Sequence, residues 1–566
     1  METMEDVLQA AGGFGKFQVA LCFGLLSVYC AIGWSLMQLS FSTMIPHWHC
    51  NINISRGARY LTAPQSNDSM LDTSSQYYYT QGGSDGPNLS TSLGDFIVQS
   101  SGCYTQENAS FETCSINGTE CDSFCFEGSA KTIISEFDLV CDLKWTKQLI
   151  TSLQMVGIFF GALLSGQLGD TFGRRKPFYG FLLLHGIFHL LAGFSVSWEM
   201  YTVCIILIGF AAGGNLVVII PYSLEFFPTR WRGLSSIIPT FQIGVAIFAG
   251  FAYLLQNWSH IHFACAVFNL PFLLGWFFFP ESARWLTAHG RIHESMRVIK
   301  KIARVNGTSV PPDAIDVLEA IAGSGKNVRS SERKYSYRDL FRTRKSTMTT
   351  IFISIIWIAL TAGYYGISFG ISSLGGNVYL NIFLVGTVEV PLNIFSLYLI
   401  NKIGRRPSAI LFFTFATLSS AGCIVAELEA PGSEKDTIIS GLSLLSKMMV
   451  AAGFCVIFVW GIELYPTVTR NLGFGFANML GRVGGIAAPF AINLDDRAVV
   501  SYVVLSAMMA VCTVLSFLLE ETKGRELADT LHEDNDTTDS ETTSATRPLY
   551  EGNIANYGSR TPLNSQ

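Results

Sequence analysis

Long apolar runs alternate with short polar segments along most of the chain. Each run is about 20 residues long, which is the length that a helix needs to cross a bilayer. The runs form two groups of six, separated by residues 281–346, so the pattern predicts an all-α membrane protein with two six-helix bundles. We expect twelve spans, at about 17–41, 149–168, 177–196, 200–224, 234–256, 261–280, 347–370, 378–400, 408–427, 438–462, 473–493 and 498–519.

The composition supports this pattern. Of the 566 residues, 49% are hydrophobic and 14% are charged, whereas roughly 25% of an ordinary soluble domain is charged. The charges crowd into a few short segments between the apolar runs. We therefore expect the lipid bilayer to be a partner of the chain, and we expect no nucleic acid partner.

Basic residues gather in alternate connections, which predicts the orientation. The short connections on the other side carry only Lys435 and Arg497. The positive-inside rule then places both termini in the cytosol of a multi-pass plasma membrane protein. The N-terminal segment lacks the basic region of a signal peptide, so the first span should be retained. The basic connections carry Arg174, Arg175, Lys176, Arg230, Arg232, Lys402, Arg405, Arg406 and Arg470.

The long segment between the first two spans, residues 42–148, is then extracellular. It holds six of the thirteen cysteines and five glycosylation sequons, which indicates an oxidising compartment. We expect a disulfide-stapled domain, but six cysteines allow 15 pairings and the sequence selects none. The cysteines form no Cys-x-x-Cys pairs, so we expect no metal. The residues concerned are Cys50, Cys103, Cys114, Cys121, Cys125 and Cys141, with sequons at Asn53, Asn67, Asn88, Asn108 and Asn117.

Two short motifs recur at equivalent points of the two halves. The turn from Gly166 to Lys176 has a weaker copy from Asn401 to Pro407. A glutamate, a Pro-Thr pair and an arginine follow the fourth span and again the tenth, beginning at Glu225 and at Glu463. The repeats predict pseudo-symmetric bundles.

The segment from Glu281 to Ser346 is basic and contains a helical stretch, His293 to Val305. The apolar residues Met296, Ile299 and Ile302 recur there at helical spacing. The tail after residue 520 is polar and acidic, which predicts disorder. The expected organisation is a cytosolic N-terminus (1–16), an N-terminal bundle (17–280), a cytosolic linker with short helices (281–346), a C-terminal bundle (347–519) and a disordered cytosolic tail (520–566).

Several motifs resemble a known transporter family. The Asp170-x-x-Gly-Arg-Arg turn, the Pro280 to Leu286 run and the Glu520 to Gly524 run resemble the signature loops of the major facilitator superfamily. The glycosylated loop, Tyr364-Tyr365-Gly366 and Glu463-Leu-Tyr-Pro resemble solute carrier family 22, the organic cation, organic anion and carnitine transporters. This resemblance implies alternating-access transport of small organic ions, with a coupling ion or counter-substrate as a further partner and no cofactor.

Charged residues at the cytosolic helix ends are candidates for a latch. Carboxylates and guanidinium groups placed there can form ion pairs across the seam between the bundles, and these pairs must break when the inside opens. The alternative is that the arginines only set the topology. The candidate latch residues are Asp170, Arg174, Glu225, Arg232, Arg284, Glu463 and Arg470.

Among the ionisable residues inside predicted spans, three stand out: Glu389, Lys447 and Arg482. Each costs ~2.5–3.5 kcal/mol at mid-bilayer unless it is paired or hydrated. Glu389 and Lys447 could form a structural ion pair. Arg482 lies in a helix rich in small residues, which suits a cavity wall. In the family resemblance this position is acidic in cation transporters and arginine in anion and carnitine transporters, and a guanidinium binds carboxylates well. The alternative is a structural pair between Arg482 and Glu389.

The cavity around Arg482 should be aromatic and weakly polar. Asn215 is better explained by a simple hydrogen bond between helices. His185 and His189 lie four residues apart on one helix face, and we favour polar packing over a metal site. The candidate substrate-binding residues are Arg482, Tyr364, Tyr365, Gln242, Asn215, Trp357, Phe383, Glu389 and Lys447, with Trp34 beside them.

The favoured function is a polyspecific transporter of organic anions or zwitterions, such as carnitine-like substrates. The alternatives are an organic cation transporter of the same family or a glycosylated receptor that transports nothing. We find no constellation of catalytic residues, so we expect no enzyme. Many proton-driven relatives have an arginine where this chain has Ile205. That difference argues against proton coupling of their type and leaves exchange, sodium coupling or uniport open.

Overall fold

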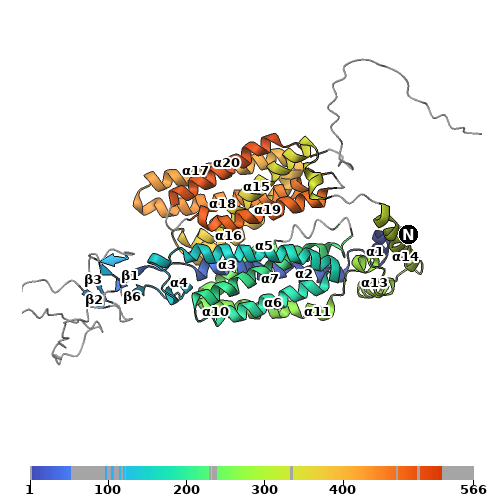
Figure 1. The fold of residues 1–566 in the computed structure, drawn as a ribbon, viewed down its shortest axis with the longest axis horizontal. Helices are drawn as coiled ribbons and strands as arrows, with labels where there is room; N and C mark the ends of the chain where they lie inside the picture. The colour runs from blue at the N-terminus through green and yellow to red at the C-terminus, as the bar shows by residue number, and fades with distance from the viewer. Residues whose placement is uncertain are drawn as a thin grey trace, which may run out of the picture.

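The long helices form two bundles that lie side by side (Figure 1). The computed structural model describes residues 3–51, 96–98, 104–106, 114–116, 119–121, 123–228, 231, 239–331, 336–466, 469–493 and 498–524. The first bundle contains α2 (Lys16–Leu26), α3 (Val28–Ser42), α5 (Thr146–Phe172), α6 (Arg175–Gly193), α7 (Trp198–Leu224), α9 (Thr240–Leu255), α10 (Trp258–Leu273) and α11 (Gly275–Phe278). The second contains α15 (Arg344–Phe369), α16 (Val378–Ile403), α17 (Arg405–Glu429), α18 (Gly432–Glu463), α19 (Arg470–Ala491) and α20 (Ala498–Leu518).

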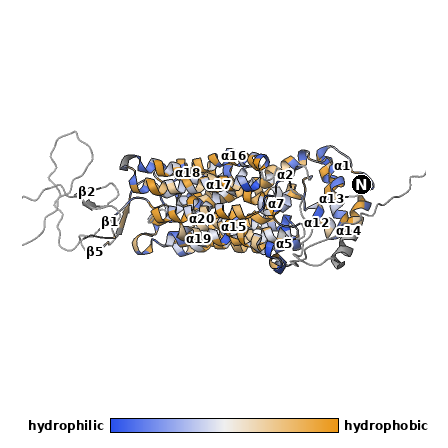
Figure 2. Cartoon of the chain, turned by 90° about the horizontal axis from the view of Figure 1, so that it is seen from above, coloured by the Kyte–Doolittle hydropathy of each residue, from blue (hydrophilic) through white to orange (hydrophobic). Residues whose placement is uncertain are grey.

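Nine helical segments in the described part of the chain are long and apolar enough to cross a membrane. The nine include α2 and α3 together as the first segment and α20 as the last. Helices α6, α9 and α19 occupy three further predicted spans, but they are not both long and apolar enough to be counted among the nine. A helical membrane protein is confirmed, and the count of twelve spans stays a prediction. Figure 2 shows hydrophobic residues along the length of both bundles.

The segment between α3 and α5 projects from one end of the bundles, which we call the loop end (Figure 1). Among its described residues there are three antiparallel strand pairs: β1 (Trp48–Asn51) with β6 (Ser123–Phe126), β2 (Phe96–Val98) with β3 (Tyr104–Gln106), and β4 (Ser115–Ile116) with β5 (Thr119–Glu120). Two short helices, α4 (Ile133–Glu136) and η1 (Cys141–Leu143), lead into α5.

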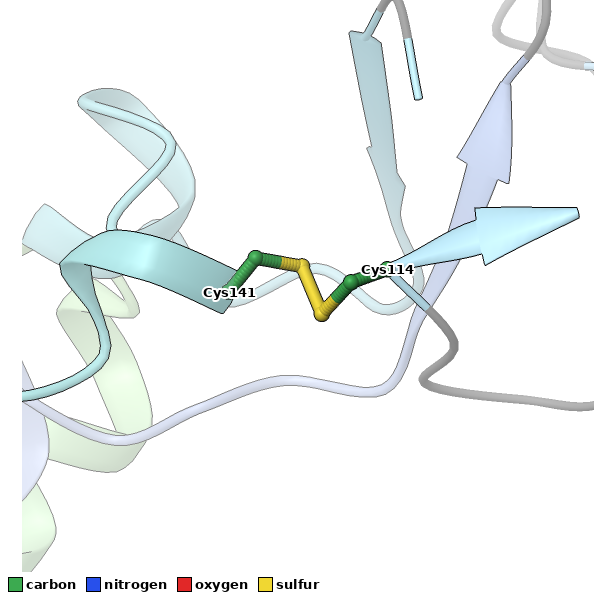
Figure 3. Close-up of a disulfide and its surroundings, with 2 residues drawn as sticks. All are labelled: Cys114 and Cys141. Carbon is green, nitrogen blue, oxygen red and sulfur yellow. A yellow bond between two sulfur atoms is a disulfide. The ribbon is translucent and has the colours of Figure 1, made fainter. Parts of the chain in front are cut away.

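A disulfide lies within this segment, close to the first bundle. Cys114 bonds Cys141, directly before α5 (Figure 3). Cys121 and Cys125 are also disulfide-bonded. The predicted staple is therefore confirmed for these four cysteines. Cys103, the side chain of Cys50 and the five sequon asparagines lie outside the described residues.

The opposite end, which we call the linker end, carries short helices. They are α1 (Met4–Ala10), α12 (Ala283–Ala288), α13 (Ile292–Asn306), α14 (Ala314–Ser331) and η3 (Tyr337–Phe341). Helix α13 confirms the predicted helical stretch, and Met296, Ile299 and Ile302 are all buried. The loop and linker ends lie at opposite ends of the long helices (Figure 1).

Glycines let α5 and α7 pack backbone against backbone. A Cβ on Gly157 or Gly161 of α5 would overlap the carbonyl oxygens of Ile206 or Phe210 on α7. On α7, Gly209 meets α5 in the same way. Small residues at four-residue spacing are a common way for membrane helices to approach closely. This seam fixes the core of the first bundle.

Hydrogen bonds join the two bundles toward the loop end. The Ser40 hydroxyl of α3 donates to the carbonyl of Ser368 on α15 at 2.9 Å. The Ser152 hydroxyl of α5 donates to the carbonyl of Ile486 on α19 at 2.6 Å. Helix α9 also packs closely against α16, where a Cβ on Gly386 would lie 2.8 Å from the Gln242 carbonyl oxygen.

The glycine seam leads to the first prediction. Gly161→Ala places a methyl group against the Phe210 carbonyl, and overpacking of this kind costs ~1–3 kcal/mol. We expect a lower thermal unfolding midpoint for the purified protein in detergent. Gly166→Ala is the matched control on the same helix, because a Cβ there meets nothing within 4 Å. Equal midpoints for the two variants would show that the seam tolerates separation.

Candidate functional site

At the linker end of the first bundle, Arg174 joins two acidic residues. Its Nη1 lies 2.7 Å from Asp170 Oδ1, and its Nε lies 3.0 Å from Glu225 Oε1. The side chain of Asp170 is 77% exposed, whereas those of Arg174 and Glu225 are 19% and 18% exposed. Burial alone would lower the pKa of Arg174, but the two carboxylates outweigh it and raise the pKa. Glu225 is therefore the better shielded partner.

A third carboxylate holds the start of α6. Glu281 Oε1 accepts the backbone N–H of Arg174 at 2.8 Å and that of Arg175 at 3.2 Å. The preceding residue, Gly173, has φ of 95°, a conformation that side chains with a Cβ rarely adopt. A Cβ on Gly173 would also collide with the Glu281 carboxylate. The glycine is needed so that the carboxylate can reach the free N–H groups of the helix.

The second bundle repeats this arrangement. Arg405 makes a fork with the Glu463 carboxylate, at 2.9 and 2.8 Å. Glu521 accepts the backbone N–H groups of Arg405 and Arg406, each at 3.0 Å. Gly404 has φ of 109°. Burial would raise the pKa of Glu521, but the backbone N–H donors outweigh it and lower the pKa. The predicted pseudo-symmetry therefore extends to single hydrogen bonds.

The other latch candidates differ from the expectation in where they pair. Arg284 Nη2 lies 2.7 Å from Glu5 Oε2 of α1, so this pair also stays within the N-terminal half. The ion pairs described at the linker end thus lie inside one half each, whereas we expected pairs across the seam. Arg470 begins α19, and Arg232 lies outside the described residues.

Two of the three intramembrane charges meet each other. Lys447 Nζ on α18 lies 3.5 Å from Glu389 Oε1 on α16, and the two side chains are 1% and 2% exposed. The same ammonium lies 2.8 Å from the centroid of the Tyr364 ring and donates to the Tyr364 carbonyl at 3.1 Å. The Tyr364 hydroxyl donates to Glu389 Oε2 at 3.2 Å. Lys447 and Glu389 therefore neutralise each other inside the second bundle.

Arg482 lies apart from this pair, on the face of α19 that meets the first bundle. It is partly buried, and among the described residues it has no hydrogen bond or ion pair. Its guanidinium interacts electrostatically with the Tyr29 hydroxyl of α3. One turn along α19, a Cβ on Gly485 would lie 3.5 Å from both the Met155 sulfur of α5 and the Tyr365 ring. Glu389 pairs with Lys447, so the alternative in which it pairs with Arg482 is not what the structure contains.

The remaining substrate candidates fall into two groups. Tyr365 lies near the Arg482 face and stacks on Phe369 with ring centroids 5.8 Å apart. Gln242 is partly buried on α9 beside α16. The others lie away from that face or inside one bundle. Trp357 packs among Phe454, Phe458 and Phe474, Trp34 stacks on Phe268, and Phe383 is 45% exposed. In the amide orientation that satisfies both of its polar atoms, Asn215 donates to the Phe178 carbonyl and accepts from the Leu182 N–H of α6.

Sequence reasoning did not single out Glu281, Glu521 or Tyr29. The two glutamates carried a usable signal, because each closely follows the last span of its half. Tyr29 carried none, since an aromatic residue in an apolar run usually packs in a core. Its role depends on Arg482, which lies 453 positions later in the chain. The pattern of one span cannot reveal that these two residues interact.

The family comparisons agree with the motifs. The family described as "Sugar (and other) transporter" matches residues 95–531. The chain is 31% identical to organic cation/carnitine transporter 2 of Mus musculus over 425 residues, which cover 74% of each chain. It is 30% identical to solute carrier family 22 member 6 of Danio rerio over 548 residues, which cover 94% of each chain.

Solved structures show the same fold. The inward open conformation of the xylose transporter XylE from E. coli matches with a TM-score of 0.53 and 17% identity, covering 67% of this chain and 87% of that one. The major facilitator fold, the family match and the two repeated charge clusters all agree. The chain therefore belongs to the major facilitator superfamily and, within it, to solute carrier family 22, and it is a membrane transport protein rather than an enzyme.

Proposed function

We propose that the protein is a polyspecific plasma membrane transporter of small organic ions, and that it favours organic anions or zwitterions such as carnitine-like substrates. One observation carries this proposal. The guanidinium of Arg482 faces the other bundle, and no described side chain neutralises it. A carboxylate or sulfonate on a substrate is the partner that fits such a group, because the planar fork binds two oxygens at once.

The contrast with Lys447 supports this assignment. An unpaired charge at membrane depth costs ~2.5–3.5 kcal/mol or more unless water or a partner reaches it. Lys447 and Glu389 avoid that cost by pairing at 1% and 2% exposure. A substrate cation would have to displace Lys447 from Glu389, whereas a substrate anion meets Arg482 without breaking a described contact. This difference favours anions and zwitterions over simple cations.

Aromatic rings beside Arg482 suit the rest of an organic ion. Tyr29 of α3 interacts electrostatically with Arg482. Tyr365 of α15, which stacks on Phe369, lies near Gly485 one turn along α19. Aromatic faces bind both flat organic anions and quaternary ammonium groups. A zwitterion with a carboxylate and an ammonium group could use Arg482 and the rings together. One relative is named an organic cation/carnitine transporter, and carnitine has this chemistry.

The proposed mechanism is alternating access, with both termini in the cytosol and twelve spans. The Ser40–Ser368 and Ser152–Ile486 hydrogen bonds lie toward the loop end. At the linker end, each described ion pair stays within one half. We therefore infer that the arrangement is closed toward the outside. In the opposite state the linker ends would approach, and their charge clusters would form the latch.

The second prediction concerns Arg482. Arg482→Ala should weaken uptake of a carboxylate substrate at least tenfold in apparent affinity, because losing one partner of a desolvated charged contact costs ~2–5 kcal/mol. Arg482→Lys keeps the charge but loses the planar fork, so its apparent affinity should fall between those of the wild type and Arg482→Ala. The measurement is concentration-dependent uptake of radiolabelled carnitine, urate and an aromatic carboxylate, with tetraethylammonium as a competing cation.

The control for this experiment is Val483→Ala, since Val483 is the next residue and is 48% exposed. It should transport with wild-type affinity at equal surface expression. Wild-type affinity in Arg482→Ala would show that the arginine is structural. Preferred uptake of tetraethylammonium, with no competition from carboxylates, would assign the protein to the organic cation branch.

The third prediction concerns the latch. Glu225→Gln leaves Arg174 with only the exposed partner Asp170, so it removes a shielded charged contact worth ~1.5–3 kcal/mol. Asp170→Asn removes an exposed ion pair, worth ~0–1 kcal/mol. We expect uptake per surface molecule to fall in both, and further in Glu225→Gln. Glu294→Gln, which breaks an exposed pair with Arg291 on α13, is the control. Normal uptake by Glu225→Gln would remove this cluster from the transport cycle.

A further inference from the structure

Three histidines form one continuous hydrogen-bonded chain inside the first bundle. His185 and His189 come from α6, and His262 comes from α10. All three are at most 1% exposed. The function proposed above uses none of them, and among the described residues no three His, Cys, Asp or Glu side chains are placed to hold a metal ion. Histidine chains inside membrane proteins often carry protons.

The chain runs from His185 toward the loop end. His185 contacts the Ser35 hydroxyl of α3 at 3.0 Å, and the same hydroxyl contacts His189 Nε2 at 3.1 Å. The Nδ1 atoms of His189 and His262 lie 3.0 Å apart. His262 Nε2 then lies 3.2 Å from the Tyr201 hydroxyl of α7.

Each end of the chain is a carbonyl oxygen that can only accept. At the inner end, His185 Nδ1 lies 3.2 Å from Asn269 Oδ1, and the Asn269 amide nitrogen donates to the Cys265 carbonyl, which fixes the amide orientation. At the outer end, the Tyr201 hydroxyl lies 3.5 Å from Gln38 Oε1, and Gln38 Nε2 is buried with no hydrogen-bond partner among the described residues. The Ser42 hydroxyl donates to the same oxygen at 3.0 Å. We call the side chains from Asn269 to Gln38 the histidine chain.

The histidine chain is one hydrogen short when it is neutral. It contains six contacts, and each needs one hydrogen. Three neutral imidazoles, one serine and one tyrosine supply only five. The missing hydrogen can fall at any one of the six contacts, and the distances favour the contact from Tyr201 to Gln38, in which case every other group donates toward the inner end. That contact is the longest of the six, at 3.5 Å.

One added proton fills every contact. If it binds His262 Nε2, this nitrogen donates to the Tyr201 oxygen, and the Tyr201 hydroxyl rotates to donate to Gln38 Oε1. No bond between heavy atoms has to move. The charge then resides on an imidazolium whose two N–H groups both have acceptors, His189 Nδ1 and the Tyr201 oxygen.

The surroundings keep the chain neutral in the arrangement seen here. The further ionisable groups that interact electrostatically with its described members are two thiols, Cys204 of α7 and Cys265 of α10. From α5 the contact comes from the amide of Gln154, which donates to the Ser35 carbonyl at 2.9 Å. The only ionisable side chain of α9, Tyr253, contacts Tyr379 instead. No carboxylate is described that would compensate an imidazolium, and burial disfavours the charged form.

The outer end of the chain lies close to a contact between the bundles. Gln38 and Ser42 lie on the face of α3 toward Tyr201, whereas Ser40, on the opposite face of the same helical turn, donates to the Ser368 carbonyl of the second bundle. Opening of this contact can therefore reach Gln38 and Tyr201 only through a movement of α3 itself. The same helix carries Tyr29, which interacts electrostatically with Arg482. Helix α3 therefore connects the histidine chain, the bundle contact and the candidate substrate site.

We propose that the histidine chain binds one proton when the Ser40–Ser368 contact opens and is empty when the contact closes, so that transport is linked to protons. His262 is the residue that holds the proton. This link differs in place from coupling through an arginine at the position of Ile205. The proposal rests on the proposed transport function only for its uptake measurement.

The first test is a titration of the purified full chain without substrate, between about pH 8 and pH 5, where histidine changes charge. Nitrogen NMR of labelled histidine side chains should show one imidazolium forming, and His262→Gln should remove that signal. Tyr201→Phe leaves four contacts for four hydrogens, so it should suppress the signal while all three imidazoles remain. His293→Gln, at an exposed position of α13, is the control and should leave the signal unchanged.

The second test uses Gln38→Glu. A carboxylate at the outer end compensates the imidazolium and cannot rotate an N–H group toward Tyr201, so the titration midpoint should rise by about one pH unit or more. The pH profile of uptake should move with it. A merely structural chain would give the same profile in Gln38→Glu and in the wild type.

The outcomes separate the two proposals. If all three imidazoles stay neutral down to the pH of unfolding, rotation of the Gln38 amide supplies the sixth hydrogen and the proton site is overturned, whatever the protein transports. A titrating imidazolium that shifts in Gln38→Glu supports the site even if no tested substrate is taken up. In that case the proposed substrate class fails and the histidine chain stands.

Discussion

Inside a bilayer a polar group has no water to bond, so it must find its partner within the protein. This constraint explains which side chains of this chain meet. Glu281 and Glu521 accept the first N–H groups of α6 and α17, which would otherwise end unpaired near the membrane surface. Lys447 and Glu389 meet for the same reason. Arg482 is informative because it departs from the rule, and a transporter needs such a departure where its substrate binds.

Much of the fold could be predicted from the sequence because the relevant signals are local. Apolar runs mark the long helices, and the repeated Gly-Arg-Arg turns mark the two halves. The residue that pairs with the first of these turns could not be predicted from a local signal. Glu281 meets Arg174 across 107 positions, and nothing near either residue specifies that contact. The strand pairs of the loop segment were also not predicted, since two- to four-residue strands leave little periodicity.

In the candidate site too, local signals could be read from the sequence, whereas contacts between distant residues could not. Rarity identified Glu389, Lys447 and Arg482, because charges seldom occur in apolar runs. Which of these charges pair depends on which sides of the helices pack together. Asn215 is an example. In the orientation that satisfies both of its polar atoms, its amide bonds the backbone of α6 within the first bundle and does not point into a substrate site. The histidines illustrate a further limit. Their helical spacing on α6 was visible, but His262 and the two terminal amides come from other helices, and the missing hydrogen emerges only when the whole chain is assembled.

The distribution of polar contacts bears on how the two bundles can move. The charged clusters, the Lys447–Glu389 pair and the histidine chain each lie within one half. The hydrogen bonds described between the bundles, Ser40 to Ser368 and Ser152 to Ile486, join neutral groups, and such bonds contribute ~0.5–1.5 kcal/mol each. Each bundle can therefore tilt as a rigid body without exposing its own charges, at a cost that substrate binding can offset. Rocking of one repeat against the other requires this separation between strong contacts within a bundle and weak contacts between bundles.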